Sequence, residues 1–291
     1  MTAKTLTTYR QYLSAISKFL DTQMELGDLT KSVLDKMIVD MRNSELSHNS
    51  INRYFIRSKG LCIILGIKEN PSRQEGDTMR IPKHIGIIPD GNRRWARRAG
   101  LPKQDGYAHG LEPGLELLRL ARDAGVQELT FYGFTTDNCG RPPEQVQAFS
   151  RACVQAVEQI ASEPVSLLVT GNRDAPAFPQ ALLPYTTRRD LNGGGIRVNF
   201  LVNYGWEWDL ARLNNPGVRR GTICAQLNSR DISRVDLVIR WGGMRRLSGF
   251  LPVQSVYADF FVVDRLWPDF QPEDFFQALQ WYQKQDVTLG G

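Results

Sequence analysis

Apolar positions divide the chain into two regions with different spacing. In residues 5–72 apolar side chains recur every three or four positions, as in Leu6, Tyr9, Leu13 and Ile16. This period is typical of amphipathic helices, because side chains three or four apart share one helix face. The pattern ends at the sequence Glu-Asn-Pro-Ser, and a polar linker follows. We therefore predict a small all-helical segment over residues 1–75 and a separate domain over residues 80–291.

From residue 80 onward, short apolar runs alternate with stretches of helical length. Runs that are apolar on both faces, with helices between them, are typical of a mostly parallel sheet covered on both sides. We therefore expect an α/β domain with a mostly parallel six-stranded sheet flanked by helices. The predicted strands are residues 84–88, 128–134, 165–170, 196–202, 235–240 and 259–264.

The composition is that of a folded protein, but it does not identify the ligand. Hydrophobic residues make up 42% of the 291 positions and charged residues 23%, which is near the average for globular domains. A net charge of +5 suits phosphates as well as nucleic acid. The four cysteines lack the spacing of a zinc site or a disulfide framework, and no apolar run is long enough to span a membrane. We expect a cytoplasmic protein.

Charged side chains gather where the predicted strands end. Parallel sheets bind ligands beyond the carboxyl ends of their strands, and arginines form paired hydrogen bonds with phosphate oxygens. The pattern therefore indicates a site for one or two diphosphates. Its candidate residues are Asp90, Gly91, Asn92, Arg93 and Arg94 after the first strand, Asn138 and Arg141 after the second, and Arg240, Arg246 and Ser248 at the fifth.

A carboxylate among phosphate-binding groups would repel an anion unless a cation accompanied it. Asp90 and Asp259 could hold Mg²⁺ between their carboxylates and diphosphate oxygens. The sequence lacks GxxxxGK[ST], and no GxGxxG follows the first strand. These absences disfavour a P-loop enzyme and a dinucleotide-binding fold.

Three blocks resemble the cis-prenyltransferases, the undecaprenyl diphosphate synthase family. They are HIGIIPDGNRRWA, FYGFTTDNCGRP and DLVIRWGGMRRLSGFLPVQSVYADFFVVDRLWPDF. The resemblance implies a homodimeric, Mg²⁺-dependent enzyme that joins an allylic diphosphate to a five-carbon isoprenyl diphosphate and releases pyrophosphate. It implies isoprenyl diphosphates as partners, a prenyl product that could bring the protein to a membrane surface, and no nucleic acid.

The resemblance also assigns a role to each candidate residue. Asp90 corresponds to the aspartate that assists metal binding and diphosphate departure, and Asn138 and Arg141 to residues near the reacting carbons and the diphosphate. Asp259 lies where the family usually has a metal-binding glutamate. The allylic diphosphate loop would be Gly91, Asn92, Arg93 and Arg94, and the second diphosphate would be bound by Arg240, Arg246 and Ser248.

Several positions depart from the family pattern. Arg93 replaces a glycine, Tyr107 a histidine, Cys139 a tryptophan and Met244 a glutamate. The block from Trp241 onward resembles short-chain, irregular members that make lavandulyl-type diphosphates by head-to-middle coupling. We therefore predict a short product from dimethylallyl, geranyl or farnesyl diphosphate, by regular or irregular coupling. A long-chain undecaprenyl or polyprenyl diphosphate synthase remains an alternative.

Residues 1–75 resemble the core-binding domain of tyrosine recombinases, in TTYRQYLSAISKFL and LSHNSINRYFIRSKG. Such domains bind DNA, and Arg53, Arg57 and Lys59 could contact phosphates. We favour a structural segment, because charged helix faces are usually solvated. A non-catalytic prenyltransferase subunit and a DNA-binding fusion protein remain as alternatives to an enzyme.

Overall fold

The computed structural model describes residues 80–213 and 223–285. The chain divides into two units after Arg80. The predicted helical segment of residues 1–75 lies outside the described residues. Its resemblance to a recombinase domain stays a prediction.

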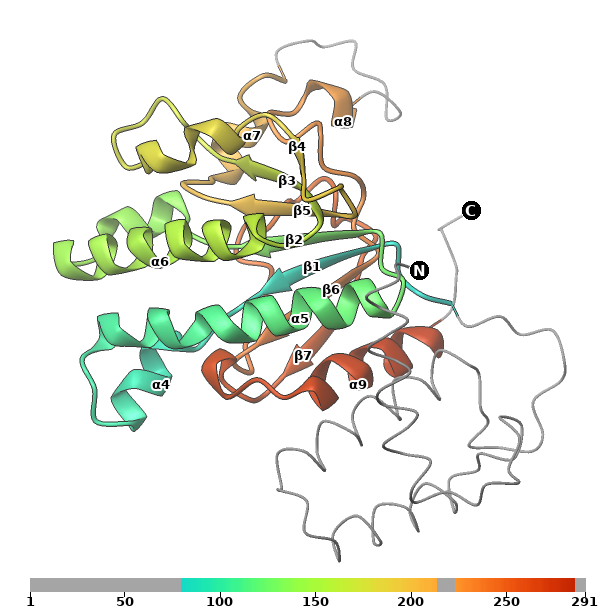
Figure 1. Ribbon diagram of the computed structural model, residues 1–291, viewed down its shortest axis with the longest axis horizontal. Helices are drawn as coiled ribbons and strands as arrows, with labels where there is room; N and C mark the ends of the chain where they lie inside the picture. Colours follow the sequence, from blue (N-terminus) through green and yellow to red (C-terminus); the bar gives the residue numbers. More distant parts are fainter. Residues whose placement is uncertain (1–79, 214–222, 286–291) are drawn as a thin grey trace, which may run out of the picture. The chain divides into compact units, whose positions relative to one another are not determined.

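A seven-stranded sheet forms the centre of the described domain (Figure 1). Its strand order is β4-β3-β5-β2-β1-β6-β7, and all neighbouring strands are parallel except β4, which runs antiparallel to β3. The strands are β1 (His84–Ile88), β2 (Glu128–Tyr132), β3 (Val165–Thr170), β4 (Arg189–Leu191), β5 (Ile196–Leu201), β6 (Leu237–Trp241) and β7 (Asp259–Val263).

The predicted α/β fold is confirmed, and all six predicted strands are present. The predicted number of strands was wrong, because β4 adds a seventh. This edge strand has three residues with the sequence Arg-Asp-Leu, and its first two side chains are exposed. It therefore carries no apolar run that a pattern could detect.

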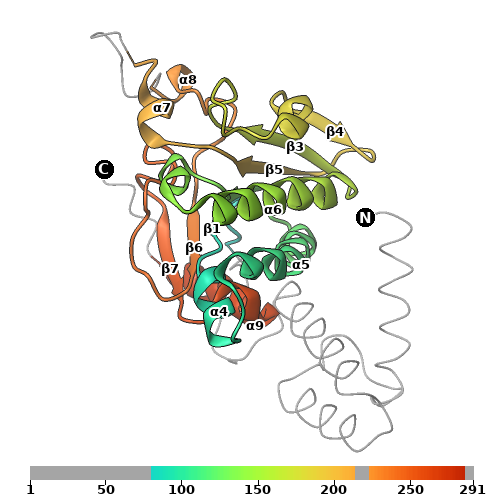
Figure 2. The ribbon, with the colours of Figure 1, turned by 90° about the vertical axis from the view of Figure 1, so that its left-hand side faces the viewer.

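Alternate strand residues point to opposite faces of the sheet. Helices α5, α6 and α9 cover one face, and the other is covered mainly by loop residues together with Trp208 of α7. Ile85 and Ile87 lie in the core with α5, α6 and α9, whereas Ile88 and Val238 lie in a second core with Tyr204. Figure 2 shows α5 and α6 side by side. The helices are α4 (Asn92–Arg98), α5 (Leu111–Asp123), α6 (Pro143–Ala161), α7 (Trp206–Leu210), α8 (Ile223–Gln226) and α9 (Pro272–Gln283). The 3₁₀ segments are η2 (Lys103–Gly110), η3 (Thr136–Gly140), η4 (Gln180–Tyr185) and η5 (Trp267–Asp269).

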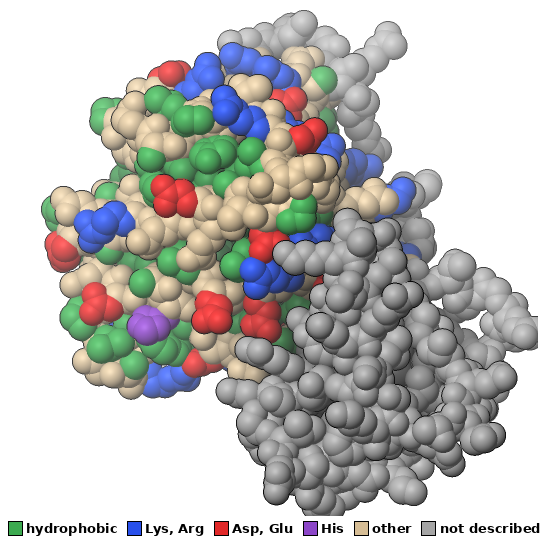
Figure 3. All heavy atoms as spheres, viewed as in Figure 1, with side chains coloured by type: hydrophobic (Ala, Val, Ile, Leu, Met, Phe, Trp, Pro, Cys, Tyr) green, Lys and Arg blue, Asp and Glu red, His purple; other side chains and the backbone are tan. Residues whose placement is uncertain are grey.

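The surface of the described domain carries charges of both signs. Figure 3 shows acidic and basic side chains intermixed with apolar ones on the face viewed there. Within residues 80–213 and 223–285, no helix is both long enough and apolar enough to cross a membrane.

The chain changes direction across the sheet beside β1. From β1 it passes through α4, η2 and α5 to β2 on one side, whereas β6 pairs with β1 on the other. Open α/β sheets bind ligands at such a point, beyond the carboxyl ends of the strands. The turn after β1 depends on Gly91, because its φ is +116° and a Cβ there would lie 2.9 Å from Leu266 Cδ2. The fold therefore places residues 90–94 at the position where a ligand is expected to bind.

Candidate active site

Asp90 and Arg240 meet at the exits of β1 and β6. Arg240 Nη2 lies 2.8 Å from Asp90 Oδ2, and Arg94 Nη2 lies 3.3 Å from Asp90 Oδ1. The Arg240 side chain is only 5% exposed. Its Nη1 atom donates hydrogen bonds to Ser248 Oγ at 2.9 Å and to the backbone oxygen of Arg246. Two guanidinium groups therefore neutralise one carboxylate and tie the first strand exit to the loop after β6.

A glycine after β6 makes room for this arrangement. Gly242 has a φ of +86°, and a Cβ there would lie 3.0 Å from the backbone oxygen of Asp90 and closer still to Arg94 Nη2. Arg94 Nη1 donates to the backbone oxygen of Gly242 at 2.8 Å. Any larger residue would separate Arg94 from Asp90.

A second pair of guanidinium groups, Arg93 and Arg141, is held by neutral partners. Arg93 Nη1 donates to Gln145 Oε1 at 3.4 Å, and Arg141 Nη1 donates to Tyr107 Oη at 3.0 Å. Burial lowers the pKa of Arg141; the Tyr107 hydroxyl opposes this and the positive charge of Arg93 adds to it. In the part of the chain that the structure describes, neither group forms an ion pair with a carboxylate. The negative charge of Asp90 also acts on Arg141, but no carboxylate contacts either guanidinium group among the described residues, so the two positive charges form a site for an anion.

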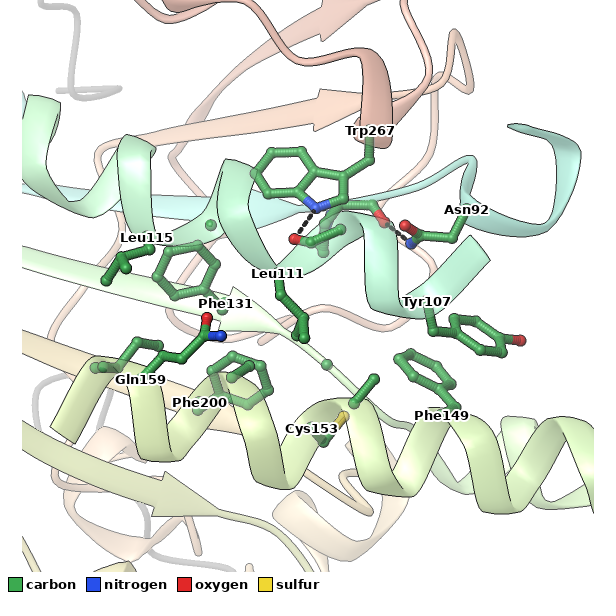
Figure 4. A pocket seen from close by; sticks show the side chains of 17 residues that line it. Asn92, Tyr107, Leu111, Leu115, Phe131, Phe149, Cys153, Gln159, Phe200 and Trp267 are labelled. Atoms are coloured by element: carbon green, nitrogen blue, oxygen red, sulfur yellow. Dashed lines mark hydrogen bonds between the residues drawn. The ribbon is translucent and has the colours of Figure 1, made fainter. Parts of the chain in front are cut away.

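An apolar cavity opens beside these cations, between the sheet and helices α5 and α6 (Figure 4). Its volume is about 60 Å³. Asn92 and Tyr107 line the end next to Arg141, and Trp267 Nε1 donates to the backbone oxygen of Gly110 at 2.9 Å beside them. The other lining side chains are mainly apolar and include Leu111, Leu115, Phe131, Phe149, Cys153, Ile160 and Phe200.

Asn92 connects the cavity with the loop after β1. Its Nδ2 atom donates to the backbone oxygen of Pro89 at 3.0 Å. Its buried Oδ1 atom has no hydrogen-bond partner among the described residues. A buried acceptor without a donor is costly, so a donor from a ligand or a water molecule is expected at this atom.

The predicted catalytic residue Asn138 supports the turn after β2. Its Oδ1 atom accepts the backbone N–H of Thr135 at 3.2 Å, as part of a capping box at the start of η3. The structure therefore gives its carboxamide oxygen a structural contact, and the second lone pair of the oxygen and the amide nitrogen remain for other partners.

Ser248 and Arg246, in the loop after β6, contact Arg240 in different ways. The hydroxyl of Ser248 contacts Arg240, and its backbone oxygen accepts Tyr132 Oη–H at 2.7 Å. Burial, assisted by the negative charge of Asp137, raises the pKa of Tyr132, so this hydroxyl keeps its proton. The Arg246 side chain is exposed, and only its backbone oxygen contacts Arg240.

Asp259 lies at the opposite end of the sheet from Asp90. It begins β7, where it pairs with Leu237, whereas Arg240 pairs with Val262. Three steps of about 3.3 Å each, or about 10 Å, separate these register positions along the strands. Within one chain, therefore, the two predicted metal ligands are not brought together, because β6 and β7 run in the same direction. A role for Asp259 in metal binding stays a prediction.

Asp90 alone fits one known way of binding Mg²⁺. No group of three or more His, Cys, Asp or Glu side chains gathers within residues 80–213 and 223–285, so these residues form no cage for a cation. However, Mg²⁺ commonly keeps several waters and binds one or two carboxylates together with substrate phosphates. The Asp90 side chain is 32% exposed, which leaves it accessible for that arrangement.

Sequence reasoning did not assign Tyr107, Gln145 or Tyr132 to the site. The bonded pairs Arg141–Tyr107 and Arg93–Gln145 are 34 and 52 positions apart in sequence. No local pattern links such residues. The only sequence signal was the departure of Tyr107 from the family pattern.

Comparison with known proteins decides the family. The model of the undecaprenyl diphosphate synthase family of prenyltransferases matches residues 88–290. The chain belongs to this family. The resemblance seen in the three sequence blocks is thereby confirmed, and the chain is a prenyl transferase.

Relatives of this prenyl transferase include bacterial enzymes that match most of its length. An isoprenyl transferase from Heliobacterium mobile is 32% identical over 77% of this chain and 93% of its own. A ditrans,polycis-undecaprenyl-diphosphate synthase specific for (2E,6E)-farnesyl diphosphate, from Pectobacterium atrosepticum, is 31% identical over 72% and 90%.

A solved structure shares the fold of this prenyl transferase. It is lavandulyl diphosphate synthase from Lavandula x intermedia in complex with dimethylallyl diphosphate, with a TM-score of 0.62. The two proteins are 22% identical, and the match covers 70% of this chain and 96% of the other. At this identity the likeness establishes the fold.

Proposed function

We propose that this prenyl transferase condenses an allylic diphosphate with a five-carbon isoprenyl diphosphate, releases pyrophosphate and makes a short product. One observation carries the proposal. Arg93 and Arg141 lack carboxylate partners among the described residues, and they lie beside a cavity with mainly apolar walls. This combination suits a molecule with a diphosphate head and a hydrocarbon tail.

The arginines would act on the departing diphosphate. When the allylic C–O bond breaks, its electron pair stays with the diphosphate, so negative charge grows on that group. Arg93 and Arg141 would stabilise this charge more in the transition state than in the ground state. Mg²⁺ held with Asp90 would supply further charge neutralisation. In this reading Asp90 and its partner Arg240 lie between the two diphosphates, and Arg240, Arg246 and Ser248 bind the second one.

The cavity walls would protect the allylic cation. Phe131 lines the cavity with an aromatic ring, and the faces of such rings attract positive charge. Mainly apolar walls also keep water from the cation. The double bond of the five-carbon substrate could then form the new C–C bond, and loss of one proton would restore a neutral hydrocarbon chain.

The size of the cavity supports a short product. Its volume of about 60 Å³ is small, because a single water already requires roughly 10–15 Å³. A long polyprenyl chain would not fit in it without movement of the walls. Phe131 and Phe200, whose ring centroids lie 5.9 Å apart, narrow the cavity, and Gln159 and Leu115 line its part far from Tyr107 (Figure 4).

A long-chain polyprenyl diphosphate synthase is the second candidate. The similarity to the Pectobacterium enzyme favours it, and helices α5 and α6 would then have to separate to admit the growing chain. Product length distinguishes the two candidates.

Product analysis tests the proposal. The protein is incubated with Mg²⁺ and dimethylallyl, geranyl or farnesyl diphosphate, with and without isopentenyl diphosphate, and products are identified by mass spectrometry. We expect short prenyl diphosphates, and a product from dimethylallyl diphosphate alone would establish irregular coupling. Long polyprenyl products would favour the second candidate. No product with any donor would contradict both and favour a non-catalytic subunit.

Two further expectations accompany this function. Light scattering on the purified protein checks the predicted homodimer. Cell fractionation checks the cytoplasmic location and any contact with membranes through the prenyl product.

A further inference from the structure

Tyr107 has two separate contacts at the end of the cavity next to Arg141. Its hydroxyl accepts a hydrogen bond from Arg141 Nη1 at 3.0 Å. Its ring stacks on that of Phe149, with centroids 4.4 Å apart and planes only 3° from parallel. The side chain is 5% exposed. Figure 4 shows the rings of Tyr107 and Phe149 facing each other beside the cavity.

Phe149 contacts the same guanidinium group. The Arg141 guanidinium carbon lies 5.6 Å from the centroid of the Phe149 ring, which is within the range of a cation–π interaction. Phe149 in turn packs edge-on against Phe134, at 5.4 Å and 77°, and Phe134 is 1% exposed. Arg141 is therefore held by a hydroxyl and a ring face, both anchored to the core.

Neutral partners keep the charge of Arg141 available. A carboxylate at position 107 would form an ion pair and compete with a diphosphate for the guanidinium group. A tyrosine hydroxyl uses one of the five N–H donors and fixes the plane of the group. The remaining donors can bind phosphate oxygens.

Tyr107 is also fixed relative to the loop that carries Asp90. The preceding residue, Gly106, packs so tightly on the backbone of Asn92 that a Cβ atom would overlap the Asn92 carbonyl group. Segment η2 therefore cannot move away from the start of α4 without breaking this contact. The distance from Tyr107 to the loop of residues 90–93 is set by the fold.

We propose that Tyr107 is a positioning residue that orients Arg141 for the diphosphate of the allylic substrate. This inference rests on the proposed function, because it assigns that diphosphate to the Arg93–Arg141 end of the cavity. It predicts that Tyr107 acts through Arg141 and through no other group.

A double-mutant cycle on ligand binding tests this coupling. The probe is dimethylallyl S-thiolodiphosphate, which carries the diphosphate and the tail but resists ionisation, and its affinity is measured by calorimetry. Tyr107→Phe keeps the stacked ring and removes only the hydroxyl. We expect it to weaken binding roughly threefold to tenfold. In an Arg141→Ala background the same change should alter affinity by less than about twofold, because interacting residues are not additive.

Two further variants provide a control and a test of the second contact of Arg141. Tyr185→Phe alters another partly buried tyrosine, which packs against the core from η4, and should bind the probe like the wild type. Phe149→Leu removes the ring face while the Tyr107 hydroxyl remains. Because Phe149 also lines the cavity, this change should weaken binding in both backgrounds, and more strongly when Arg141 is present. Thermal melting of each variant confirms folding.

The outcomes separate this inference from the proposed function. Wild-type affinity in Tyr107→Phe, or an equal loss with and without Arg141, would overturn the inference even if the enzyme makes product. A coupled loss of affinity in a protein that makes no prenyl product would support the inference and overturn the proposed function. A wild-type protein that does not bind the probe would overturn both.

Discussion

The guanidinium group of Arg240 is buried against the carboxylate of Asp90, with Nη2 and Oδ2 2.8 Å apart. The contact joins the exits of two neighbouring parallel strands, at the point where the chain changes direction across the sheet. Arg93 follows in the same loop, and Arg141 lies next to the apolar cavity through its contact with Tyr107. The loop after β1 therefore carries both the Asp90 carboxylate and a cation with a neutral partner.

Asp90→Asn tests whether this carboxylate has a chemical role. The amide keeps the shape of the side chain but loses its charge, so we expect turnover to fall by at least about a hundredfold. We also expect a loss of about 1–2 kcal/mol in the free energy of unfolding, because Arg240 would be left buried without its counter-charge. Steady-state rates and thermal melts measure both. The control Asp123→Asn, at an exposed ion pair with Arg122, should change neither, and near-normal turnover in Asp90→Asn would refute the assigned role.

Gly242→Ala tests the close approach of Arg94 to the loop after β6. The new Cβ would strain a left-handed residue, at a cost of about 1–2 kcal/mol, and would displace Arg94 from Asp90. Gly100 provides the matched control, because its φ is +72° but nothing lies within 4 Å of a Cβ there. We expect similar backbone strain in both variants and a loss of activity only in Gly242→Ala. Equal activity in the two variants would show that the contact is dispensable.

Phe200→Leu tests the role of the cavity in product length. Replacement of the ring by a smaller side chain lengthens the space beside Phe131, so we expect the product to gain at least one isoprenyl unit. Mass spectrometry of the products measures this. Phe276→Leu, at a partly buried position on α9, should leave the product unchanged. An unchanged product in Phe200→Leu would argue that the cavity does not set chain length.

Stability should fall with acidification because of His84. Burial lowers its pKa below the ordinary value of 6.5, although the negative charges of Glu128 and Asp236 oppose this. The ring is neutral in the fold, where Nε2 lies 2.7 Å from Thr130 Oγ1. The unfolded chain therefore binds one more proton below pH 6.5. The free energy of unfolding should decrease as pH drops below 6.5, by up to about 1.4 kcal/mol per pH unit, until the pKa of the folded state is reached.

Denaturation series from pH 8 to pH 5 measure this dependence. His84→Gln removes the titrating group, and its stability should vary less with pH over the same range. The same slope in both proteins would assign the effect to other groups.

Much of the fold was predictable because its signals are local. Each apolar run from His84 to Asp264 forms a strand, since a buried parallel strand needs apolar residues on both faces. Strand β4 was not predictable, because its pairing depends on the distant strand β3 and on no pattern of its own.

Within the site, only residues at the carboxyl ends of strands were predictable from the sequence. Asp90 and Arg240 were placed together by the rule that ligands bind beyond the carboxyl ends of parallel strands. The partners that orient the arginines, such as Tyr107, are set by tertiary contacts that no local spacing reveals. Asp259 shows a different limit: its match to a family motif suggested a place beside Asp90, but it begins β7 and therefore lies at the amino end of a strand parallel to β6.

A crystal structure with dimethylallyl S-thiolodiphosphate and Mg²⁺ tests the proposed site most directly. We expect the diphosphate to contact Arg93 and Arg141, with Mg²⁺ between it and Asp90, and the hydrocarbon tail to lie against Phe131 and Phe149. A diphosphate bound elsewhere on the protein, or a tail outside the cavity, would contradict the proposed function.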